Sequence, residues 1–241
     1  MSQNSINGKA PLANVALCLG SLEKLKTCPA HLPRIGVLYG PSGYGKSTAA
    51  AVSCIRHNAY YVQGRSSWTK KSAHQAMLKE MGIAPGKTVA EMADQVAEQL
   101  VISGRPLIID EADYLVDKGS IEIIRDIYEA SQAPIMLIGE EALPNKLRKF
   151  ERFHGRVLDW VPAQPASLED AFALRDLYAT RAAIADDLMI LIHEQAHGSV
   201  RRIVVNIELM QDTAKSLGLD SIDRAAWGNR PLYTGNAPSR G

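Results

Sequence analysis

Short runs of apolar residues alternate with longer stretches of helical pattern through the first two thirds of the chain. Such runs, stopped by glycine or polar residues, are typical of buried strands in a parallel sheet. They are Ile35–Tyr39, Tyr60–Val62, Leu107–Ile109, Ile135–Ile138 and Val157–Val161. The stretches between them favour helices, at Lys46–Arg56, Lys71–Met81, Thr88–Val101, Ser120–Ser131 and Leu143–Lys149. This alternation predicts an α/β fold, with a five-stranded parallel sheet and helices on both faces.

Helical patterns also flank the predicted sheet. Before it, apolar residues recur every three or four positions, at Leu12, Val15, Leu19, Leu22 and Leu25. After it, Pro162 and Pro165 interrupt the chain, and three helical stretches follow, at Leu168–Arg181, Asp186–His197 and Ser199–Leu217, with Ser167 and Asp186 as N-caps. We therefore expect an α/β domain over residues 1–161, a small helical lid domain over 162–219, and a loosely ordered tail over 220–241, which is rich in Gly, Pro, Asn and Arg.

The composition, with 46% hydrophobic and 22% charged residues, is that of a globular protein. Lys and Arg total 27 against 26 Asp and Glu, so any nucleic-acid binding must come from a local basic patch. The three cysteines have no CxxC spacing and no His/Cys cluster has metal-ligand spacing, so neither a disulfide framework nor a zinc site is implied. The first ten residues lack the apolar region of a signal peptide, and no apolar run approaches the ~20 residues that span a bilayer. We expect a soluble, cytoplasmic protein without a membrane partner.

A phosphate-binding motif lies between the first predicted strand and the helix that follows it. The residues Gly40, Pro41, Ser42, Gly43, Tyr44, Gly45, Lys46 and Ser47 match GxxxxGK[ST] in the strand–loop–helix context that the motif requires. Its glycines let backbone N–H groups turn toward phosphates, and the helix N-terminus adds positive potential. We expect Lys46 to reach the β- and γ-phosphates of ATP, Ser47 to ligate Mg²⁺, and Thr48 to complete the nucleotide-binding set.

Two carboxylates follow the third apolar run, in Leu107-Ile108-Ile109-Asp110-Glu111. Beside a phosphate-binding loop, such a pair is typical of nucleotide hydrolysis. Asp110 is expected to hold Mg²⁺, and Glu111 to orient and polarise the attacking water. Asp113 is interpreted as a helix-entry or supporting residue.

The phosphate-binding motif, the segment Ile109–Asp113 and the helical lid together resemble the AAA+ ATPases. The resemblance implies ATP hydrolysis by an oligomer, a polar residue after the fourth strand that senses the γ-phosphate, an arginine near the fifth strand that reaches the neighbouring subunit's nucleotide, and a lid arginine that contacts phosphate. Glu140 stands at the sensor position, where the family usually has an amide or hydroxyl. Arg156 is the first choice for the arginine in trans, with Arg152 as the other candidate, and Arg201 is the candidate lid arginine.

Within that family, the stretch from Ile138 to Arg156 is similar to the transposition-helper branch, which contains the B proteins of Mu-like transposable phages and transposon ATPase regulators. This similarity implies a homo-oligomer, either a ring or a helical filament, that binds double-stranded DNA with ATP and recruits a transposase. Only about 33 residues precede the first predicted strand, too few for a separate helix-turn-helix domain, so we expect the ATPase core itself to contact DNA.

The proposed DNA contacts lie after the second predicted strand, in Arg65-Ser66-Ser67-Trp68-Thr69-Lys70-Lys71. Here charged, hydroxyl and aromatic groups interleave, and Thr69, Lys70 and Lys71 are the expected phosphate contacts. A second basic cluster is assigned to a subunit interface: Lys146, Arg148, Lys149 and Arg152. An alternative function also stays open, a helicase-loader, secretion-assembly or other remodelling ATPase that does not bind duplex DNA tightly.

Overall fold

The computed structural model describes residues 10 and 12–237, which divide into two compact units. The core unit comprises Val15–Pro41 and Lys46–Ala163. The C-terminal unit comprises Gln164 onward, together with Ser42–Gly45 and the described residues up to Asn14. We expected the division at residue 161, with all of the N-terminal part in one domain. The structure instead groups the tip of the phosphate-binding loop with the C-terminal helices, and the hydrogen bonds responsible are described below.

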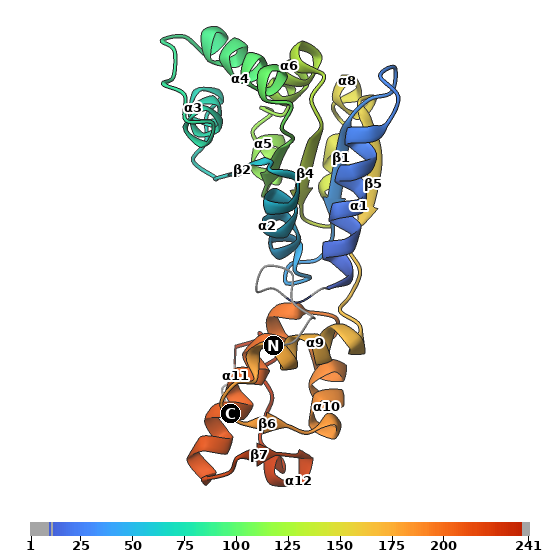
Figure 1. Cartoon of the computed structure of the whole chain (residues 1–241), viewed down its shortest axis with the longest axis vertical. Coiled ribbons are helices and arrows are strands. Elements are labelled where there is room, and N and C mark those ends of the chain that lie inside the picture. The colour runs from blue at the N-terminus through green and yellow to red at the C-terminus, as the bar shows by residue number, and fades with distance from the viewer. Residues whose placement is uncertain (1–9, 11, 238–241) are drawn as a thin grey trace. The chain divides into compact units, whose positions relative to one another are not determined.

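A five-stranded parallel sheet forms the centre of the core unit, as predicted (Figure 1). Its strands are β1 (Ile35–Tyr39), β2 (Tyr60–Gln63), β3 (Leu107–Asp110), β4 (Ile135–Gly139) and β5 (Val157–Pro162). They run in the order β2-β3-β4-β1-β5, and each neighbouring pair is parallel. The expected strand positions differ from the observed ones by no more than one residue at either end.

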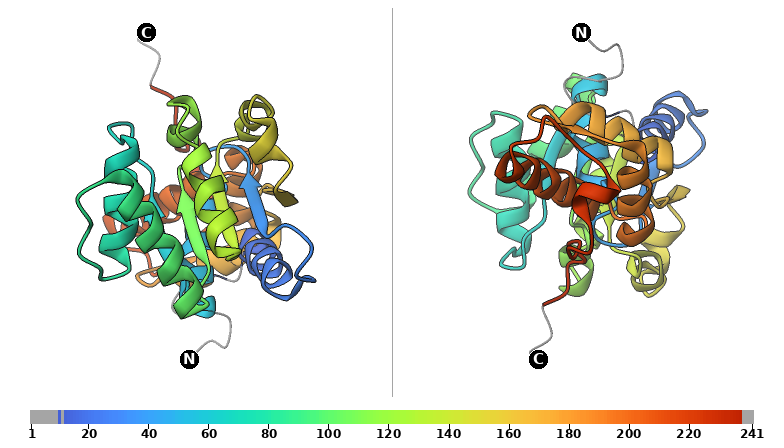
Figure 2. Two further views of the ribbon diagram at one scale, coloured as in Figure 1. Left: turned by 90° about the horizontal axis from the view of Figure 1, so that it is seen from above. Right: turned by 90° about the horizontal axis from the view of Figure 1, so that it is seen from below.

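Helices cover both faces of this sheet (Figure 2). Alternate strand residues such as Val37, Ile109 and Leu137 join the large apolar core on one face, to which the segment from α3 to α8 contributes. On the other face, Gly36 lies against Leu25 of α1 and beside Met136 of β4. The helices are α1 (Ala13–Thr27), α2 (Lys46–His57), α3 (Lys70–Glu80), α4 (Val89–Ser103), α5 (Asp113–Asp117), α6 (Glu122–Ser131), α7 (Leu143–Leu147) and α8 (Glu151–His154). No helical stretch was predicted for α5 or α8, although Asp113, which was interpreted as a helix-entry or supporting residue, begins α5.

The C-terminal unit contains more than the three predicted helices. Its elements are α9 (Leu168–Tyr178), β6 (Ala183–Ile184), α10 (Asp186–Ala196), α11 (Val200–Leu217), β7 (Ser221–Ile222) and α12 (Arg224–Trp227). Ser167 caps α9 as expected, since its hydroxyl accepts a hydrogen bond from the N–H of Asp170 at 3.1 Å. The prediction for Asp186 was wrong: Ala185 is the N-cap of α10, and Asp186 forms an ion pair with Arg175 instead.

The expectation of a loosely ordered tail over 220–241 is corrected for residues 221–227, while residues 238–241 lie outside the described residues. Strand β7 pairs in parallel with β6, and Trp227 of α12 is only 2% exposed. The indole N–H of Trp227 donates to the carbonyl of Arg230 at 2.9 Å. A two-residue strand and a single buried aromatic residue do not form a periodic pattern. The sequence prediction therefore followed the many turn-forming residues of this segment.

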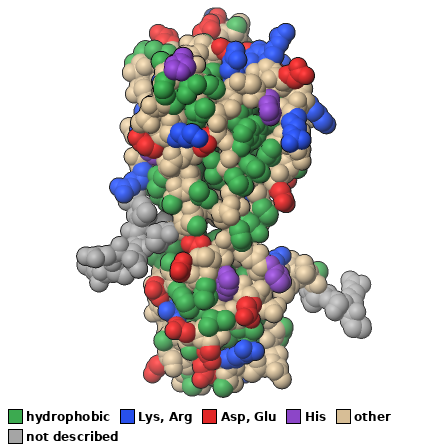
Figure 3. Space-filling view, turned by 90° about the vertical axis from the view of Figure 1, so that its right-hand side faces the viewer, with side chains coloured by type: hydrophobic (Ala, Val, Ile, Leu, Met, Phe, Trp, Pro, Cys, Tyr) green, Lys and Arg blue, Asp and Glu red, His purple; other side chains and the backbone are tan. Residues whose placement is uncertain are grey.

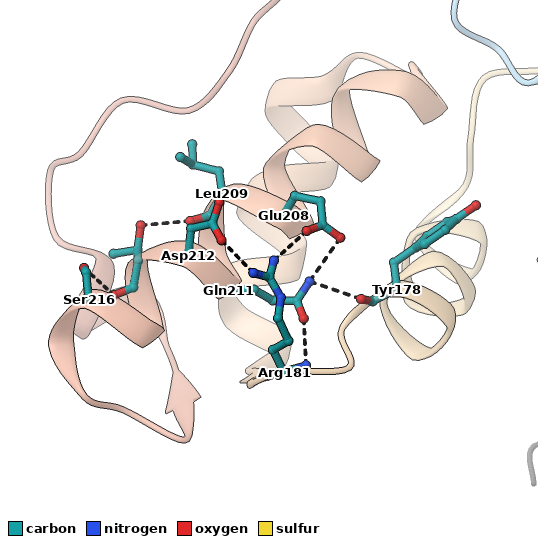
Figure 4. Close-up of polar contacts among 8 residues, drawn as sticks. Tyr178, Arg181, Glu208, Leu209, Gln211, Asp212 and Ser216 are labelled. Carbon is teal, nitrogen blue, oxygen red and sulfur yellow. Dashed lines mark hydrogen bonds and ion pairs between the residues drawn. The ribbon is translucent and has the colours of Figure 1, made fainter.

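Buried amide side chains attach irregular segments of this unit to helix α11. In the cluster of Figure 4, Gln211 is fully buried and bonds the loop that leads to β6. Its Oε1 accepts from the N–H of Arg181 at 2.8 Å, and its Nε2 donates to the carbonyl of Tyr178 at 3.1 Å. The guanidinium of Arg181 binds Glu208 and Asp212 at 2.6 and 2.7 Å. These bonds stabilise a loop that has few apolar residues to bury.

Candidate nucleotide site

The predicted phosphate-binding loop connects β1 to α2, where the motif requires it. Gly43 and Gly45 have φ angles of +87° and +80°, in a region that residues with a Cβ adopt at a cost. The ammonium of Lys46 donates to the carbonyls of Gly40 and Pro41, at 2.7 and 2.8 Å. The lysine therefore folds back over the start of its own loop, in the region where phosphates bind such motifs.

Two backbone carbonyls at the loop tip are bonded within the C-terminal unit. The N–H of Arg201 donates to the carbonyl of Gly43 at 3.2 Å, and the side-chain amide of Asn14 donates to the carbonyl of Tyr44 at 2.8 Å. Arg201 lies in the first turn of α11 and its side chain is exposed. Its backbone thus contacts the loop, which the sequence interpretation did not anticipate. The side-chain contact with phosphate remains a prediction.

Asp110 ends β3 and is 2% exposed. One carboxylate oxygen accepts from the Tyr61 hydroxyl at 3.0 Å, and the other accepts from the N–H of Glu111 at 2.9 Å. Burial and the charge of Asp110 raise the pKa of Tyr61, which keeps the phenol protonated as the donor. Because a carboxylate offers about four lone-pair sites, Asp110 retains acceptors beyond these two bonds.

The residues fit a magnesium ion that arrives with a nucleotide. Asp110 and the exposed Ser47, in the first turn of α2, supply the oxygen donors that Mg²⁺ prefers. Within the described residues, no group of three or more His, Cys, Asp and Glu side chains is arranged to hold a metal by itself. Mg²⁺ is commonly held by one or two carboxylates with substrate phosphates and water. The donor set therefore suits a metal that is bound together with ATP. Thr48, next in α2, is partly buried.

Glu111 has an unusual backbone and an unfavourable charge environment. Its φ of +53° lies in the left-handed region, which is uncommon for a residue with a side chain and is enriched at functional sites. Burial raises its pKa, and the charges of Asp110, Asp113 and Glu140 raise it further, while Lys46 opposes them. Burial correspondingly lowers the pKa of Lys46, against the pull of the same carboxylates. Titratable groups perturbed in this way are typical of catalytic sites.

Asp113 supports the loop after β4, where Glu140 stands. It begins α5, is 5% exposed, and accepts a hydrogen bond from the N–H of Glu140 at 2.7 Å. Lys146 lies 3.1 Å from Asp113 and 2.9 Å from Asp117. The side chain of Glu140 is exposed. Lys146, which we assigned to a subunit interface, is thus bound to carboxylates of its own unit, and the ammonium partly neutralises the acidic cluster.

Arg156 lies at the end of the sheet where the parallel strands begin, whereas the phosphate-binding loop lies at the end where they finish. It precedes β5, whose Val157 pairs with Ile35 at the start of β1, whereas the loop follows the end of β1. Because a strand rises ~3.3 Å per residue, the four steps from Ile35 to Tyr39 separate the two ends of the sheet by roughly 13 Å. The guanidinium is 46% exposed and forms an ion pair with Glu129 of α6. This position does not suit an arginine that acts on its own subunit's nucleotide. Arg152, on α8, is also exposed.

The expected DNA-binding residues lie at the start of α3, with one correction. Lys70 and Lys71 are exposed in its first turn, but Trp68 is only 7% exposed and belongs to the apolar core. It therefore offers no ring for stacking. The hydroxyl of Thr69 accepts from the N–H of Ser72 at 3.2 Å as the N-cap. The helix N-terminus already carries a partial positive charge, and Lys70 and Lys71 add to it. A negatively charged partner is therefore favoured at this position.

The face of the molecule drawn in Figure 3 carries mixed charge. In the view of Figure 3, acidic and basic side chains are interspersed on the core unit, with hydrophobic groups between them. Among the residues described, no helix is both long enough and apolar enough to traverse a bilayer.

Comparison with known proteins identifies the fold. Residues 30–147 match the family model described as an AAA domain. The structure is similar to Cdc6p from Pyrobaculum aerophilum, at a TM-score of 0.66 and 16% identity over 92% of this chain and 66% of that one. It is also similar to the Aeropyrum pernix Orc1 protein, solved in complex with DNA. That match has a TM-score of 0.61 and 20% identity, and it covers 89% of this chain and 62% of the Orc1 chain. The match to a Thermotoga maritima RuvB mutant has a TM-score of 0.62 and 18% identity, and it covers 94% of this chain and 71% of the RuvB chain.

The chain spans less than two thirds of the length of the Cdc6p and Orc1 structures, at 66% and 62%. A search of curated proteins found no match. The family match covers β1, the phosphate-binding loop, and the strands and helices as far as Leu147, and therefore includes Lys46, Asp110 and Glu111. Residues 30–147 of this chain thus resemble an AAA domain, and they include four of the five strands of its parallel sheet.

Proposed function

We propose that this protein is an AAA+ ATPase that binds ATP with Mg²⁺ and hydrolyses it to ADP and phosphate. The observation that carries the proposal is the joint placement of Lys46, Asp110 and Glu111 in one electrostatic cluster of an AAA domain. Lys46 balances phosphate charge, Ser47 and Asp110 hold the metal, and the glycines of the loop present backbone N–H groups. Mg²⁺ supplies charge neutralisation at the β- and γ-phosphates when bound.

Glu111 acts on the water in this proposal. Its carboxylate accepts a hydrogen bond from the attacking water and draws the proton away as the oxygen approaches the γ-phosphorus. The raised pKa brings its basicity closer to neutrality than that of an ordinary carboxylate, which favours proton transfer at cellular pH. The left-handed backbone at Glu111 is consistent with a side chain held by its surroundings in a working orientation.

The proposed active form is a homo-oligomer, in which Arg156 reaches the neighbouring subunit's nucleotide. Its position opposite the loop edge of its own sheet supports action in trans. Engagement requires Arg156 to leave Glu129, an exchange between exposed partners that costs little. Glu140 is proposed to sense the γ-phosphate, through repulsion that Mg²⁺ and Lys46 must offset.

We further propose that the oligomer binds double-stranded DNA and recruits a transposase in the cytoplasm. Exposed Lys70 and Lys71 support the DNA contact, and the similarity in fold to an Orc1 protein solved with DNA is compatible with it. The transposase partner rests on the resemblance of residues 138–156 to transposition helpers. Each subunit contributes few phosphate contacts, so the affinity of the oligomer comes from neighbouring subunits.

The decisive experiment measures phosphate release and duplex binding by the same protein. We expect ATP hydrolysis, and fluorescence anisotropy that shows ATP-dependent binding to duplex DNA, weakened steeply by salt. The Lys70→Ala/Lys71→Ala variant is expected to lose DNA affinity while it still binds ATP. A Lys79→Ala/Lys87→Ala variant removes the same charge from exposed positions elsewhere and serves as the control. Absence of hydrolysis would reject the ATPase assignment.

A loader or remodelling ATPase is the second candidate. The burial of Trp68 and the capping role of Thr69 favour it, because they remove two groups from the expected DNA surface. ATP hydrolysis without duplex binding at low salt would select this function over the transposition helper.

A further inference from the structure

Asn14 is a buried polar residue that the nucleotide site described above does not explain. It is 3% exposed, and each of its hydrogen bonds joins a segment remote in sequence. Its Nδ2 donates to the carbonyl of Tyr44 and to the carbonyl of Gln164, both at 2.8 Å. Its Oδ1 accepts from the N–H of Gln164 at 2.8 Å. All three segments belong to the C-terminal unit.

The bond to Tyr44 controls a peptide plane in the phosphate-binding loop. In a trans peptide, the C=O of one residue and the N–H of the next point in opposite directions. Holding the Tyr44 carbonyl on Asn14 therefore turns the N–H of Gly45 away from Asn14. The glycines on both sides of Tyr44 have positive φ angles and leave this plane free to rotate unless something restrains it.

The neighbouring peptide is restrained in the same way. The N–H of Arg201 holds the Gly43 carbonyl at 3.2 Å, which sets the direction of the Tyr44 N–H. The lid therefore bonds one plane of the loop, and Asn14 bonds the next. Asn14 also bonds the linker at Gln164, which lies just before α9.

The same short segment is bonded to the first turn of α9. The N–H of Ala13 donates to the carboxylate of Asp170 at 3.0 Å, and Asp170 is 8% exposed and part of the capping box of that helix. A displacement of α9 or of the linker therefore acts on residues 13 and 14, and through Asn14 on the peptide that carries the Gly45 N–H.

We infer that Asn14 is a positioning residue for nucleotide binding, which aims the Gly45 N–H at phosphate and couples the loop to the linker and the lid. The inference rests on the proposed ATP site. It predicts that Asn14 affects nucleotide affinity beyond any effect on stability, because the loop must present its N–H groups in a fixed direction before phosphate binds.

The C-terminal unit supplies a matched control. Asn206 is also fully buried and makes the same set of bonds to backbone: two donated, to Arg202 at 2.9 Å and Tyr233 at 3.0 Å, and one accepted from the N–H of Tyr233 at 2.8 Å. Asn206→Ala thus removes an equivalent buried amide that has no bond to the phosphate-binding loop. Thermal unfolding measures the structural effect of each substitution.

The experiment compares Kd for a fluorescent ATP analogue with Mg²⁺ in the wild type, Asn14→Ala and Asn206→Ala. We expect both variants to lower Tm, Asn14→Ala to weaken binding about tenfold or more (~1.4 kcal/mol), and Asn206→Ala to stay within about twofold. An unchanged Kd for Asn14→Ala, or an equal loss in both variants, overturns the inference. A wild type that does not bind the analogue rejects the proposed ATP site and this inference with it.

Asn14→Asp keeps the inference testable if the alanine variant fails to fold. It is nearly isosteric and retains the acceptor for the Gln164 N–H, but it sets a carboxylate oxygen against the Tyr44 carbonyl. We expect its loss of ATP affinity to equal or exceed tenfold. Affinity retained by Asn14→Asp would show that the linker bond, and not the bond to the loop, is what matters, and would overturn the inference.

Discussion

Replacing Glu111 by Gln removes a negative charge while keeping the length of the side chain, and so separates hydrolysis from nucleotide binding. Loss of a general base lowers turnover by on the order of 10²-fold or more. That factor corresponds to about 2.7 kcal/mol of lost transition-state stabilisation, at about 1.36 kcal/mol for each tenfold. ATP affinity is expected to persist or improve, because one carboxylate near the phosphates is gone.

Stability is expected to change in the opposite direction to activity. The pKa of Glu111 is raised by burial and by Asp110, Asp113 and Glu140, so the folded protein disfavours the charged carboxylate. Below the ordinary value of 4.5 the group is protonated in both the folded and unfolded states. As the pH rises through the raised pKa, the wild type loses stability because its unfolded state releases the proton more readily. The neutral amide introduced by Glu111→Gln does not titrate, so this variant gains stability relative to the wild type toward neutral pH.

The assay combines phosphate release with thermal unfolding between pH 4 and 8, values chosen as roughly bracketing carboxylate titration. Glu141→Gln makes the same chemical change at an exposed position and is expected to leave turnover unchanged. Turnover of Glu111→Gln within a few-fold of the wild type would refute the role as base. A stability difference that shrinks as the pH rises would refute the repulsion argument.

Three further predictions test other parts of the structure. Lys46→Ala is expected to abolish binding of a fluorescent ATP analogue, because no other side chain of the loop balances the phosphate charge. Lys149→Ala, at an exposed position, is expected to retain ATP binding. Equal affinity in the two variants would reject the site. Arg156→Ala is expected to lower hydrolysis about 10³-fold without loss of ATP binding, and mixing it with Lys46→Ala subunits is expected to restore some activity if the arginine acts in trans; mixed assemblies that stay inactive would contradict this. Trp227→Ala is expected to destabilise the C-terminal unit by about 3–5 kcal/mol, the usual cost of removing a buried Trp, as measured by chemical denaturation; a loss below about 1 kcal/mol would show that α12 contributes little to the fold.

Local patterns in the sequence were sufficient for the strands, for most of the helices and for the nucleotide motif. A buried parallel strand needs a continuous apolar run, and a phosphate-binding loop needs glycines and a lysine at fixed spacing, so both are recorded in consecutive residues. The same holds for the helix that Ser167 caps, because a capping box spans only four positions. The short helices α5 and α8 and the strands β6 and β7 were missed, since two to five residues carry no measurable periodicity.

The tertiary structure alone decided which polar groups meet. Asn14 bonds Tyr44 and Gln164, which are 30 and 150 positions away, and Lys146 binds Asp113 across two helices. It also placed Trp68 in the core, where the sequence suggested an exposed aromatic. Which side chains are buried, and which partners they bond, depends on how separate elements pack together. Consecutive residues in the sequence contain no local signal for that packing. The sequence by itself therefore determined the strands and the residue types of the proposed nucleotide site, while the fold determined which residues contact them.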